Sequence, residues 1–349
     1  EPSGDLLGSK ILSKLKDKFE DIEVIGVGGG PLKEHNISTD REMLEIMGLV
    51  DPVLNLRKII NYRNDLIQNF INEKIDIFIG IDAPDFNFDI HKKLQKKGVK
   101  TIHVVCPSVW AWRPGRVKKF KYVDYMLCLF PFELEYCTNV NKQAFCIGHP
   151  LLDKQSDYEN NERENIICLM PGSRRSEIKN NLDVMIDGFN QFNFDEKYKA
   201  VIPIYKEDDK HLIQHKIQSH KHITFANVES SEILKKAKAA VICSGTATLE
   251  ALLAEIPTTV IYKTNWLNHF TLKHMMMSEF VSIPNIIADE EIFLELLQSN
   301  ATSENVADDL NSNMADYKFR KKMIQAVKAK LGKTNLDSFS NRLYEDCRS

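Results

Sequence analysis

Short apolar runs rich in β-branched residues alternate with longer segments of helical spacing along most of this chain. Such alternation predicts parallel strands that are linked by helices, as in an open, doubly wound sheet. The predicted strands are 22–27, 75–81, 100–105, 125–130, 144–148, 166–170, 200–205, 222–226, 239–243 and 258–262. In the first half, helical spacing with charged outer faces occurs at 4–18, 54–73, 86–97 and 131–138.

One polar stretch, residues 156–165, has almost no apolar side chain and is the best candidate for a domain boundary. From about residue 286 onward strand patterns vanish, and we expect helices to dominate to the end of the chain. A chain of 349 residues is long for a single core. The predicted fold class is therefore α/β, with two facing, doubly wound (Rossmann-like) domains at 1–155 and 165–315, a helical tail at 316–349 and a ligand cleft between the domains.

The composition excludes several classes of protein. Lysine and arginine number 46 against 49 acidic residues, and the net charge of −3 gives no overall attraction to nucleic acid. No apolar run approaches the roughly 20 residues that span a bilayer, and no signal-peptide pattern opens the chain, so we expect a cytoplasmic protein. The 7 cysteines are scattered without a C-x-x-C pair, which favours buried free thiols over zinc or disulfides. Because the sequence opens at Glu1 without an initiator methionine or an opening strand, we expect that a short N-terminal piece of the natural protein is missing.

The segment EPSGD at 1–5 is followed at once by a helical pattern. Ser3 and Asp5 are typical N-cap residues, and Gly4 lets the backbone approach a ligand closely. The N–H groups at such a helix start can bind an anion. An ordinary capped helix explains the same residues equally well.

The segment IDAPDFN at 81–87 places two carboxylates at the end of a predicted strand. In open α/β sheets, ligands lie at the carboxyl ends of the strands. Asp82 is therefore a candidate general base, since an alcohol nucleophile must lose its proton as it attacks. The alternative for Asp82 is a bond within the turn, and for Asp85 we favour capping of the next helix.

Aromatic and basic residues gather in CPSVWAWRPGR at 106–116. Trp110 and Trp112 offer flat apolar area, and Arg113 can bind phosphate through two N–H groups. A lipid phosphate or a sugar suits this pattern better than nucleic acid, although both tryptophans could simply belong to the core. His149, at the end of a predicted strand, also faces the ligand edge, but a single histidine is more often structural.

Two further strands end in glycine turns that lead into helices. After 166–170, Gly172 and Ser173 could hold a diphosphate while Arg174 neutralises charge on a leaving group. After 239–243, the turn offers N–H and hydroxyl donors to phosphate, and a carboxylate one helical turn further could accept ribose hydroxyl groups. The residues of this second turn are Ser244, Gly245, Thr246 and Glu250.

Two turns that suit a diphosphate favour a nucleotide ligand. A nicotinamide cofactor is not expected, because Pro31 stands where the fingerprint in GVGGGP needs its third glycine. A P-loop ATPase is not supported, because G-x-x-x-x-G-K-[ST] does not occur.

Taken together, the motifs resemble the lipid-A-disaccharide synthase family along almost the whole chain. EPSGD, IDAPDFN, PSVWAWR, LFPFE, GHPLLD, PGSR-x-x-EI, SGTATLEALL and VSIPN occur in that family's order and at about its spacing. Cys106 departs from the usual serine, Gly30-Pro31-Leu32 replaces the commoner Pro-Arg-Met, and Asp289-Glu290 replaces Gly-Arg.

The resemblance implies a glycosyltransferase-B architecture with an N-terminal acceptor domain, a C-terminal nucleotide-sugar domain and a terminal helix that crosses back. It also implies an inverting transfer of 2,3-diacylglucosamine from UDP-2,3-diacylglucosamine to 2,3-diacylglucosamine 1-phosphate, which yields the lipid A disaccharide 1-phosphate and UDP. Asp82 falls on the family's proposed catalytic acid and Arg174 on its essential arginine. The positions associated with UDP are Ser244, Gly245, Thr246, Glu250 and Asn285.

Neither a cofactor nor a metal is expected, since no group of residues has metal-ligand spacing. Both substrates carry acyl chains, so we expect the protein at the cytoplasmic face of the inner membrane, where 54–71 could form an amphipathic interfacial helix. Packing of that helix into the core is the alternative. Inner-membrane lipids and a second copy in a homodimer are the expected partners, without nucleic acid. The competing functions are a UDP-sugar epimerase, another amino-sugar transferase, or a binding module without catalysis.

Overall fold

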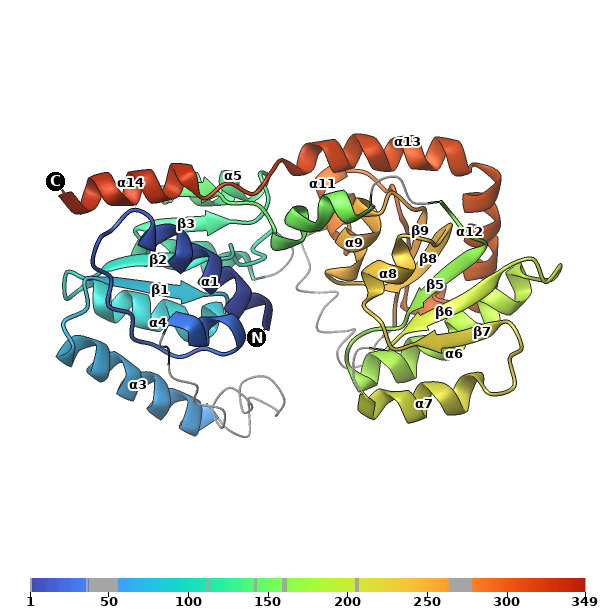
Figure 1. The fold of residues 1–349 in the computed structure, drawn as a ribbon, viewed down its shortest axis with the longest axis horizontal. Coiled ribbons are helices and arrows are strands. Elements are labelled where there is room, and N and C mark those ends of the chain that lie inside the picture. Colours follow the sequence, from blue (N-terminus) through green and yellow to red (C-terminus); the bar gives the residue numbers. More distant parts are fainter. Residues whose placement is uncertain are drawn as a thin grey trace. The chain divides into compact units, whose positions relative to one another are not determined.

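The computed structural model describes residues 2–35, 37, 56–110, 113–140, 143–158, 162–204, 207–263 and 278–348. It divides into two compact units, of which the first comprises 1–150 with 333–349 and the second comprises 151–332. Each unit is built on a parallel sheet (Figure 1). The predicted α/β class, with two parallel sheets and a helical C-terminal end, is confirmed.

The described part of the first unit contains a four-stranded parallel sheet in the order β1-β2-β3-β4. Three of these strands, β1, β3 and β4, are mostly apolar because parallel sheets are covered on both faces, whereas β2 carries Lys100, Thr101 and His103. The bounds of β1 to β4 are Ile77–Ile81, Lys100–Val104, Tyr125–Cys128 and Ala144–Cys146. The helices of this unit are α1 (Pro2–Lys16), η1 (Gly30–His35), α3 (Leu56–Asn72), α4 (Pro84–Gln95), η2 (Pro114–Tyr122), α5 (Glu133–Thr138) and α14 (Asp337–Arg348).

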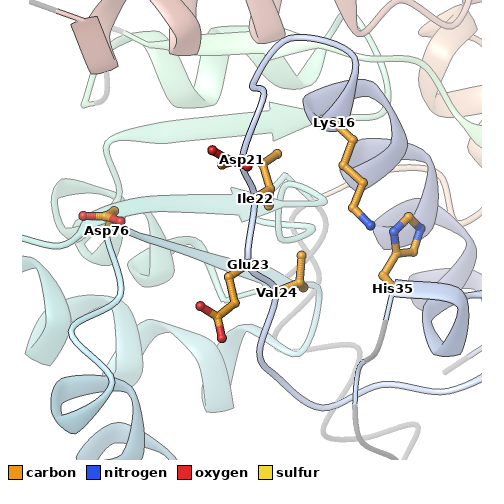
Figure 2. A pocket seen from close by; sticks show the side chains of 7 residues that line it. All are labelled: Lys16, Asp21, Ile22, Glu23, Val24, His35 and Asp76. Atoms are coloured by element: carbon orange, nitrogen blue, oxygen red, sulfur yellow. The ribbon is translucent and has the colours of Figure 1, made fainter.

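The predicted strand at 22–27 is wrong. These residues are described, but only Val27 makes an isolated bridge and no strand forms. A cavity of about 830 Å³ is lined on one side by 21–24 and on another by Asp76, which precedes β1 (Figure 2). The segment thus lies across a cavity from the start of β1, and an apolar run becomes a strand only where a neighbour supplies hydrogen bonds.

The second unit contains a six-stranded parallel sheet in the order β10-β9-β8-β5-β6-β7. The strands β5 to β10 span Ile166–Met170, Lys199–Pro203, Ile223–Ala226, Ala239–Cys243, Thr258–Tyr262 and Leu294–Leu297. The helices are η3 (Pro150–Tyr158, which begins at the junction), α6 (Arg175–Phe192), α7 (Glu207–Ile217), α8 (Ser230–Leu234), α9 (Ala247–Leu253), α11 (Ile283–Ala288), η4 (Gln298–Asn300), α12 (Ser303–Ala315), α13 (Tyr317–Lys328) and η5 (Ala329–Leu331). The edge strand β10 lies beyond residue 286, where the sequence showed no strand pattern, so the expectation of no strand there is wrong. The pattern is weak because β10 is short, half-buried and carries Glu295.

The core of the second unit depends on the close packing of α6 against α12. Met185 and Phe189 of α6 and Leu310 of α12 are fully buried. At Gly188 a Cβ would lie 2.6 Å from Val306 Cγ1 and 3.0 Å from the Ser303 carbonyl oxygen. Only glycine therefore lets the two helices approach so closely.

The last helix, α14, packs on the first unit, although most of that unit comes from residues 1–150 (Figure 1). The Tyr125 hydroxyl donates to the Asp346 carboxylate, and Lys100 Nζ donates to the Asp346 carbonyl oxygen at 3.0 Å. Lys14 of α1 pairs with Asp337 at 2.5 Å. Among the helices that the structure describes, none combines the length and apolarity needed to cross a bilayer.

Candidate functional site

Asp82 lies in a tight turn where β1 ends. Its backbone N–H donates to the Val104 carbonyl oxygen at 2.8 Å and so continues the ladder to β2. Asp82 and Ala83 have φ of 47° and 39°, in the left-handed region that residues with a Cβ rarely adopt. The buried Asn87 donates through Nδ2 to the carbonyl oxygens of Ile81 (3.2 Å) and Asp82 (2.8 Å). Asn87 therefore fixes a strained turn from which Asp82 is exposed.

The first turn of α1 lies beside this strand end. A Cβ at Gly4 would be 3.5 Å from Ile81 Cγ2, next to Asp82 in sequence. The N-cap prediction for Ser3 and Asp5 is wrong, because α1 begins at Pro2 and both residues lie inside its first turn. Proline is favoured there, since its fixed φ suits the helix start. Asp5 instead accepts a hydrogen bond from the Gly29 N–H at 3.0 Å, while Ser3 is exposed.

Two arginines meet Asp85 three residues after Asp82. Asp85 was expected to cap α4, but the N-cap is Ala83, and no side chain caps it. Asp85 Oδ2 pairs with Arg113 Nη1 at 3.0 Å and with Arg116 Nη2 at 2.5 Å. The side chains of Asp85 and Arg113 are 60% and 44% exposed, so this ion pair adds little stability and Arg113 can exchange partners. Trp112, in the same motif, lies outside the described residues.

A row of aromatic rings connects Trp110 with His149. Trp110 meets Phe132 edge to face at 5.4 Å between ring centroids, Phe132 stacks on Phe130 at 5.9 Å, and Phe130 stacks on His149 at 5.8 Å. Burial, with a smaller contribution from Lys10, lowers the pKa of His149 to about 4. His149 is therefore neutral near pH 7 and offers a hydrogen bond or a ring face, but no charge.

In the second unit, the two predicted glycine turns lie side by side. Within the sheet, β6 and β7 follow on one side of β5, and the chain then returns so that β8 lies on the other side of β5. β5 pairs directly with β8, with Met170 opposite Ile242 (Figure 1). The turns at 171–174 and 244–246 follow the carboxyl ends of these two strands. They therefore flank the topological switch point, where open α/β sheets bind ligands.

A carboxylate already binds the N–H groups of the first turn. Gly172 has a φ of 123°, and a Cβ there would lie 2.4 Å from Glu177 Cβ. Glu177 Oε2 accepts from the N–H groups of Ser173 (3.0 Å) and Arg174 (3.2 Å), and Oε1 pairs with Arg174 Nη1 at 3.1 Å. The side chain of Arg174 is 77% exposed. The anionic group that this turn binds in the structure is the Glu177 carboxylate.

The second turn exposes its backbone. Gly245 has a φ of 149°, and no described atom lies within 4 Å of the place where its Cβ would be. Thr246 is exposed, and Ser244 Oγ donates to the Val281 carbonyl oxygen at 3.1 Å. Glu250 accepts a hydrogen bond from Ser230 Oγ at 2.5 Å, and burial raises its pKa.

The structure does not support a direct contact between Asn285 and a nucleotide. The residue is fully buried, and its side-chain N–H groups donate to the Phe293 carbonyl oxygen and to Glu295 Oε1, both at 2.8 Å. Its Oδ1 accepts from the N–H groups of Ile292 (3.0 Å) and Phe293 (2.9 Å). All four hydrogen-bonding positions of the amide are used. Asn285 and Glu295 are scaffold residues that hold the segment to which Ser244 bonds.

Asn181 joins the two turns and was not predicted. It is fully buried in α6, and its Nδ2 donates to the Pro171 carbonyl oxygen at 3.4 Å and to Cys243 Sγ at 3.6 Å. Its Oδ1 accepts from the Lys263 N–H at 3.0 Å. One amide thus ties together the ends of β5, β8 and β9.

Comparisons with known proteins show the family of the chain. The family model described as lipid-A-disaccharide synthetase matches residues 1–343. The lipid-A-disaccharide synthase of Saccharophagus degradans is 34% identical over 349 aligned positions, which cover 94% of this chain and 89% of the relative. That of Pseudomonas putida strain GB-1 is 37% identical over 324 positions, which cover 89% and 86%.

Solved structures support the fold. The UDP-GlcNAc 2-epimerase from Neisseria meningitidis bound to UDP-GlcNAc has a TM-score of 0.63 at 11% identity, covering 99% of this chain and 97% of that chain. A glycosyltransferase from Rickettsia africae has a TM-score of 0.54 at 12% identity, covering 99% and 96%. These neighbours show the fold of glycosyltransferases of the GT-B type and related epimerases. With the family match over nearly the whole length, the chain belongs to the lipid-A-disaccharide synthase family and is a glycosyltransferase of lipid A biosynthesis.

Proposed function

We propose that the chain transfers 2,3-diacylglucosamine from UDP-2,3-diacylglucosamine to 2,3-diacylglucosamine 1-phosphate with inversion at the anomeric carbon. The products are the lipid A disaccharide 1-phosphate and UDP. The observation that carries this proposal is the pair of turns, 171–174 and 244–246, on adjacent strands at the switch point of the second unit. Two such turns can bind the two phosphates of one nucleotide-sugar.

The donor diphosphate replaces the Glu177 carboxylate at the first turn. That carboxylate already accepts from the N–H groups of Ser173 and Arg174, which supports an anion site at this turn. Arg174 then exchanges Glu177 for the diphosphate and neutralises the charge that grows as UDP leaves. Gly245 and Thr246 add exposed backbone and hydroxyl donors to the diphosphate. Glu250, which accepts from Ser230 Oγ, also accepts hydrogen bonds from the ribose hydroxyl groups.

Asp82 acts as the general base on the acceptor. Its carboxylate takes the proton from the acceptor's 6-hydroxyl group, and the oxygen attacks the anomeric carbon from the face opposite UDP. The new carbon–oxygen bond forms as the bond to the diphosphate breaks, so one displacement inverts the configuration. The exposed position of Asp82 and the two hydrogen bonds from Asn87 support this role.

The acceptor's phosphate is bound by Arg113 near the end of β1. Arg113 is half-exposed and paired with the exposed Asp85, whose carboxylate a phosphate dianion can replace. Ser3 and Gly4, in the first turn of α1, lie at the same strand end and can donate to the acceptor. The ring row from Trp110 to His149 offers flat apolar surface for the sugar or its acyl chains.

The first half of α3 contacts lipid at the cytoplasmic face of the inner membrane. Ile67 and Phe70 of its second half are buried in the core, as the packing alternative expected. Leu56 and Ile60 of its first half are 56% and 37% exposed, and the basic Arg57 and Lys58 are exposed between them. Apolar and basic side chains together favour an anionic lipid surface. Acyl chains in both substrates require such a surface.

The test is an assay of purified protein with both acylated substrates, in which disaccharide and UDP are measured together. We expect Asp82→Asn to lower kcat by about 100- to 10,000-fold and Arg174→Ala by about 100- to 1,000-fold. The matched controls, Asp187→Asn and Arg175→Ala, alter exposed residues of the same type and should retain activity. The anomeric configuration of the product, read by NMR, tests inversion.

Full activity in Asp82→Asn would overturn the general-base role. Turnover of the UDP-sugar without the acylated acceptor would contradict the substrate assignment and favour an epimerase.

A further inference from the structure

Three thiols that are far apart in sequence meet beneath the carboxyl edge of the first sheet. Cys106 follows β2, Cys128 ends β3 and Cys137 lies in α5. Cys137 Sγ is 3.5 Å from Cys106 Sγ and 3.6 Å from Cys128 Sγ, and all three sulfurs lie within 4.8 Å of one another. The three residues are free thiols and at most 2% exposed.

The surroundings of this thiol cluster (Cys106, Cys128 and Cys137) are mainly apolar, and the one titratable neighbour among the described residues that acts on Cys106 and Cys137 is the buried carboxyl group of Glu133. The cluster packs with Phe88, Val109, Phe120, Val123 and Met126. The sequence predicted scattered buried thiols, because the cysteines form no C-x-x-C pair. The fold nevertheless brings three soft ligand atoms from three elements to one point.

We propose that this thiol cluster binds one soft, thiophilic cation of the class of Zn²⁺, Cd²⁺ and Cu⁺. Zinc–thiolate bonds are about 2.3 Å long, so sulfurs around one ion lie roughly 3.8 Å apart in a tetrahedral site and about 4.0 Å apart in a planar one. The two shorter separations are therefore a few tenths of an ångström from the required values. Thiolate ligands select soft cations over Mg²⁺ or Ca²⁺.

Binding changes the protonation of the cluster. Each coordinating thiol loses one proton to solvent, so a divalent cation with three thiolates leaves a net charge of −1 at the site. The proposal therefore includes proton release and weaker binding at acid pH. A bound ion would also fix the ends of β2 and β3 to α5, just below the segment that carries Trp110.

The experiment uses Cd²⁺ as the probe, with the full chain in a Cys347→Ser background because Cys347 is exposed. Reduced protein is incubated with Cd²⁺ for hours just below its melting temperature, since buried thiols exchange slowly. We expect about one bound Cd²⁺ per chain, a thiolate-to-metal charge-transfer band in the ultraviolet, and a higher Tm. Cys106→Ser and Cys137→Ser should each lose the band and most of the bound metal. Cys168→Ser, a buried thiol of the second unit, should keep both.

X-ray absorption of the complex in the same Cys347→Ser background supplies a measurement that needs no cluster variant. A first shell of three sulfur neighbours supports the proposal, and a shell of oxygen or nitrogen overturns it. Failure to bind Cd²⁺, or equal binding by the parent protein and Cys137→Ser, overturns it as well.

Discussion

Asn87 is expected to act on catalysis through Asp82, although it need not touch either substrate. Its two hydrogen bonds to backbone carbonyl oxygens contribute about 0.5–1.5 kcal/mol each. They hold Asp82 and Ala83 in left-handed conformations, each of which costs roughly 1–3 kcal/mol. The two hydrogen bonds together contribute about 1–3 kcal/mol, which offsets part of the roughly 2–6 kcal/mol of strain in the two residues, so Asn87→Ala should let the turn relax. Misplacement of a reacting group by about 1 Å can lower a rate by about 100-fold.

The assay measures initial rates of disaccharide formation over a range of both substrates, together with urea unfolding. Asn87→Ala should lower kcat by about 100-fold, with much smaller changes in KM, and lower stability by about 1–3 kcal/mol. Asn87→Asp, which keeps the size but lacks the N–H donors, should behave similarly. Asn311→Ala, at an exposed helical asparagine, is the control and should change neither quantity.

A double variant separates positioning from a general loss of structure. If Asn87 acts through Asp82, then Asn87→Ala adds little once Asp82→Asn has removed the base. Independent, multiplicative losses in Asn87→Ala/Asp82→Asn would refute the reasoning. So would an unchanged kcat in a single variant that has lost stability.

The remaining predictions concern packing, pH and membrane binding. Gly188→Ala should destabilise the chain by about 1–3 kcal/mol, because its Cβ would clash with Val306. Thermal melting measures this loss, with Gly115→Ala as the control, because no described atom crowds a Cβ there. An unchanged Tm in Gly188→Ala would contradict the prediction. Burial raises the pKa of Glu133 to about 7, so the folded chain holds a proton that the unfolded chain loses above about pH 4.5. The free energy of unfolding should therefore fall by about 3 kcal/mol as the pH rises from 4.5 through 7. Urea titrations of Glu133→Gln over the same pH range should lack this fall. Leu56→Glu/Ile60→Glu should lower the fraction of protein that sediments with anionic vesicles, whereas Asn69→Glu, exposed in the second half of α3, should not. Equal vesicle binding by the double variant and the parent protein would contradict the proposed lipid surface.

Much of the fold could be predicted because buried parallel strands are continuous apolar runs. The runs that became β1 to β9 were all identified, with boundaries within a few residues. The run at 22–27 has the same composition, but strand formation depends on a hydrogen-bonding neighbour that composition does not specify. β10 was missed because a four-residue edge strand with an internal glutamate lacks the pattern.

At the site, the glycine turns could be predicted because φ above zero and close approach both require glycine. Glu177 could have been identified as well, since a glutamate at the third helical position is the pattern of a capping box. Asn87 and Asn181 could not, because nothing in a sequence says which carbonyl a buried amide will meet. The partners of Asn285 could not be predicted either, because they are scaffold groups 7–10 residues away, and its association with UDP stays a prediction.

The most direct measurement is a crystal structure of the chain with UDP. The expected result is a diphosphate within hydrogen-bonding distance of the N–H groups at 173–174 and 245–246, with Arg174 turned toward it and the Glu177 carboxylate displaced. A nucleotide bound elsewhere, or bound while Glu177 still accepts from Ser173 and Arg174, would contradict it.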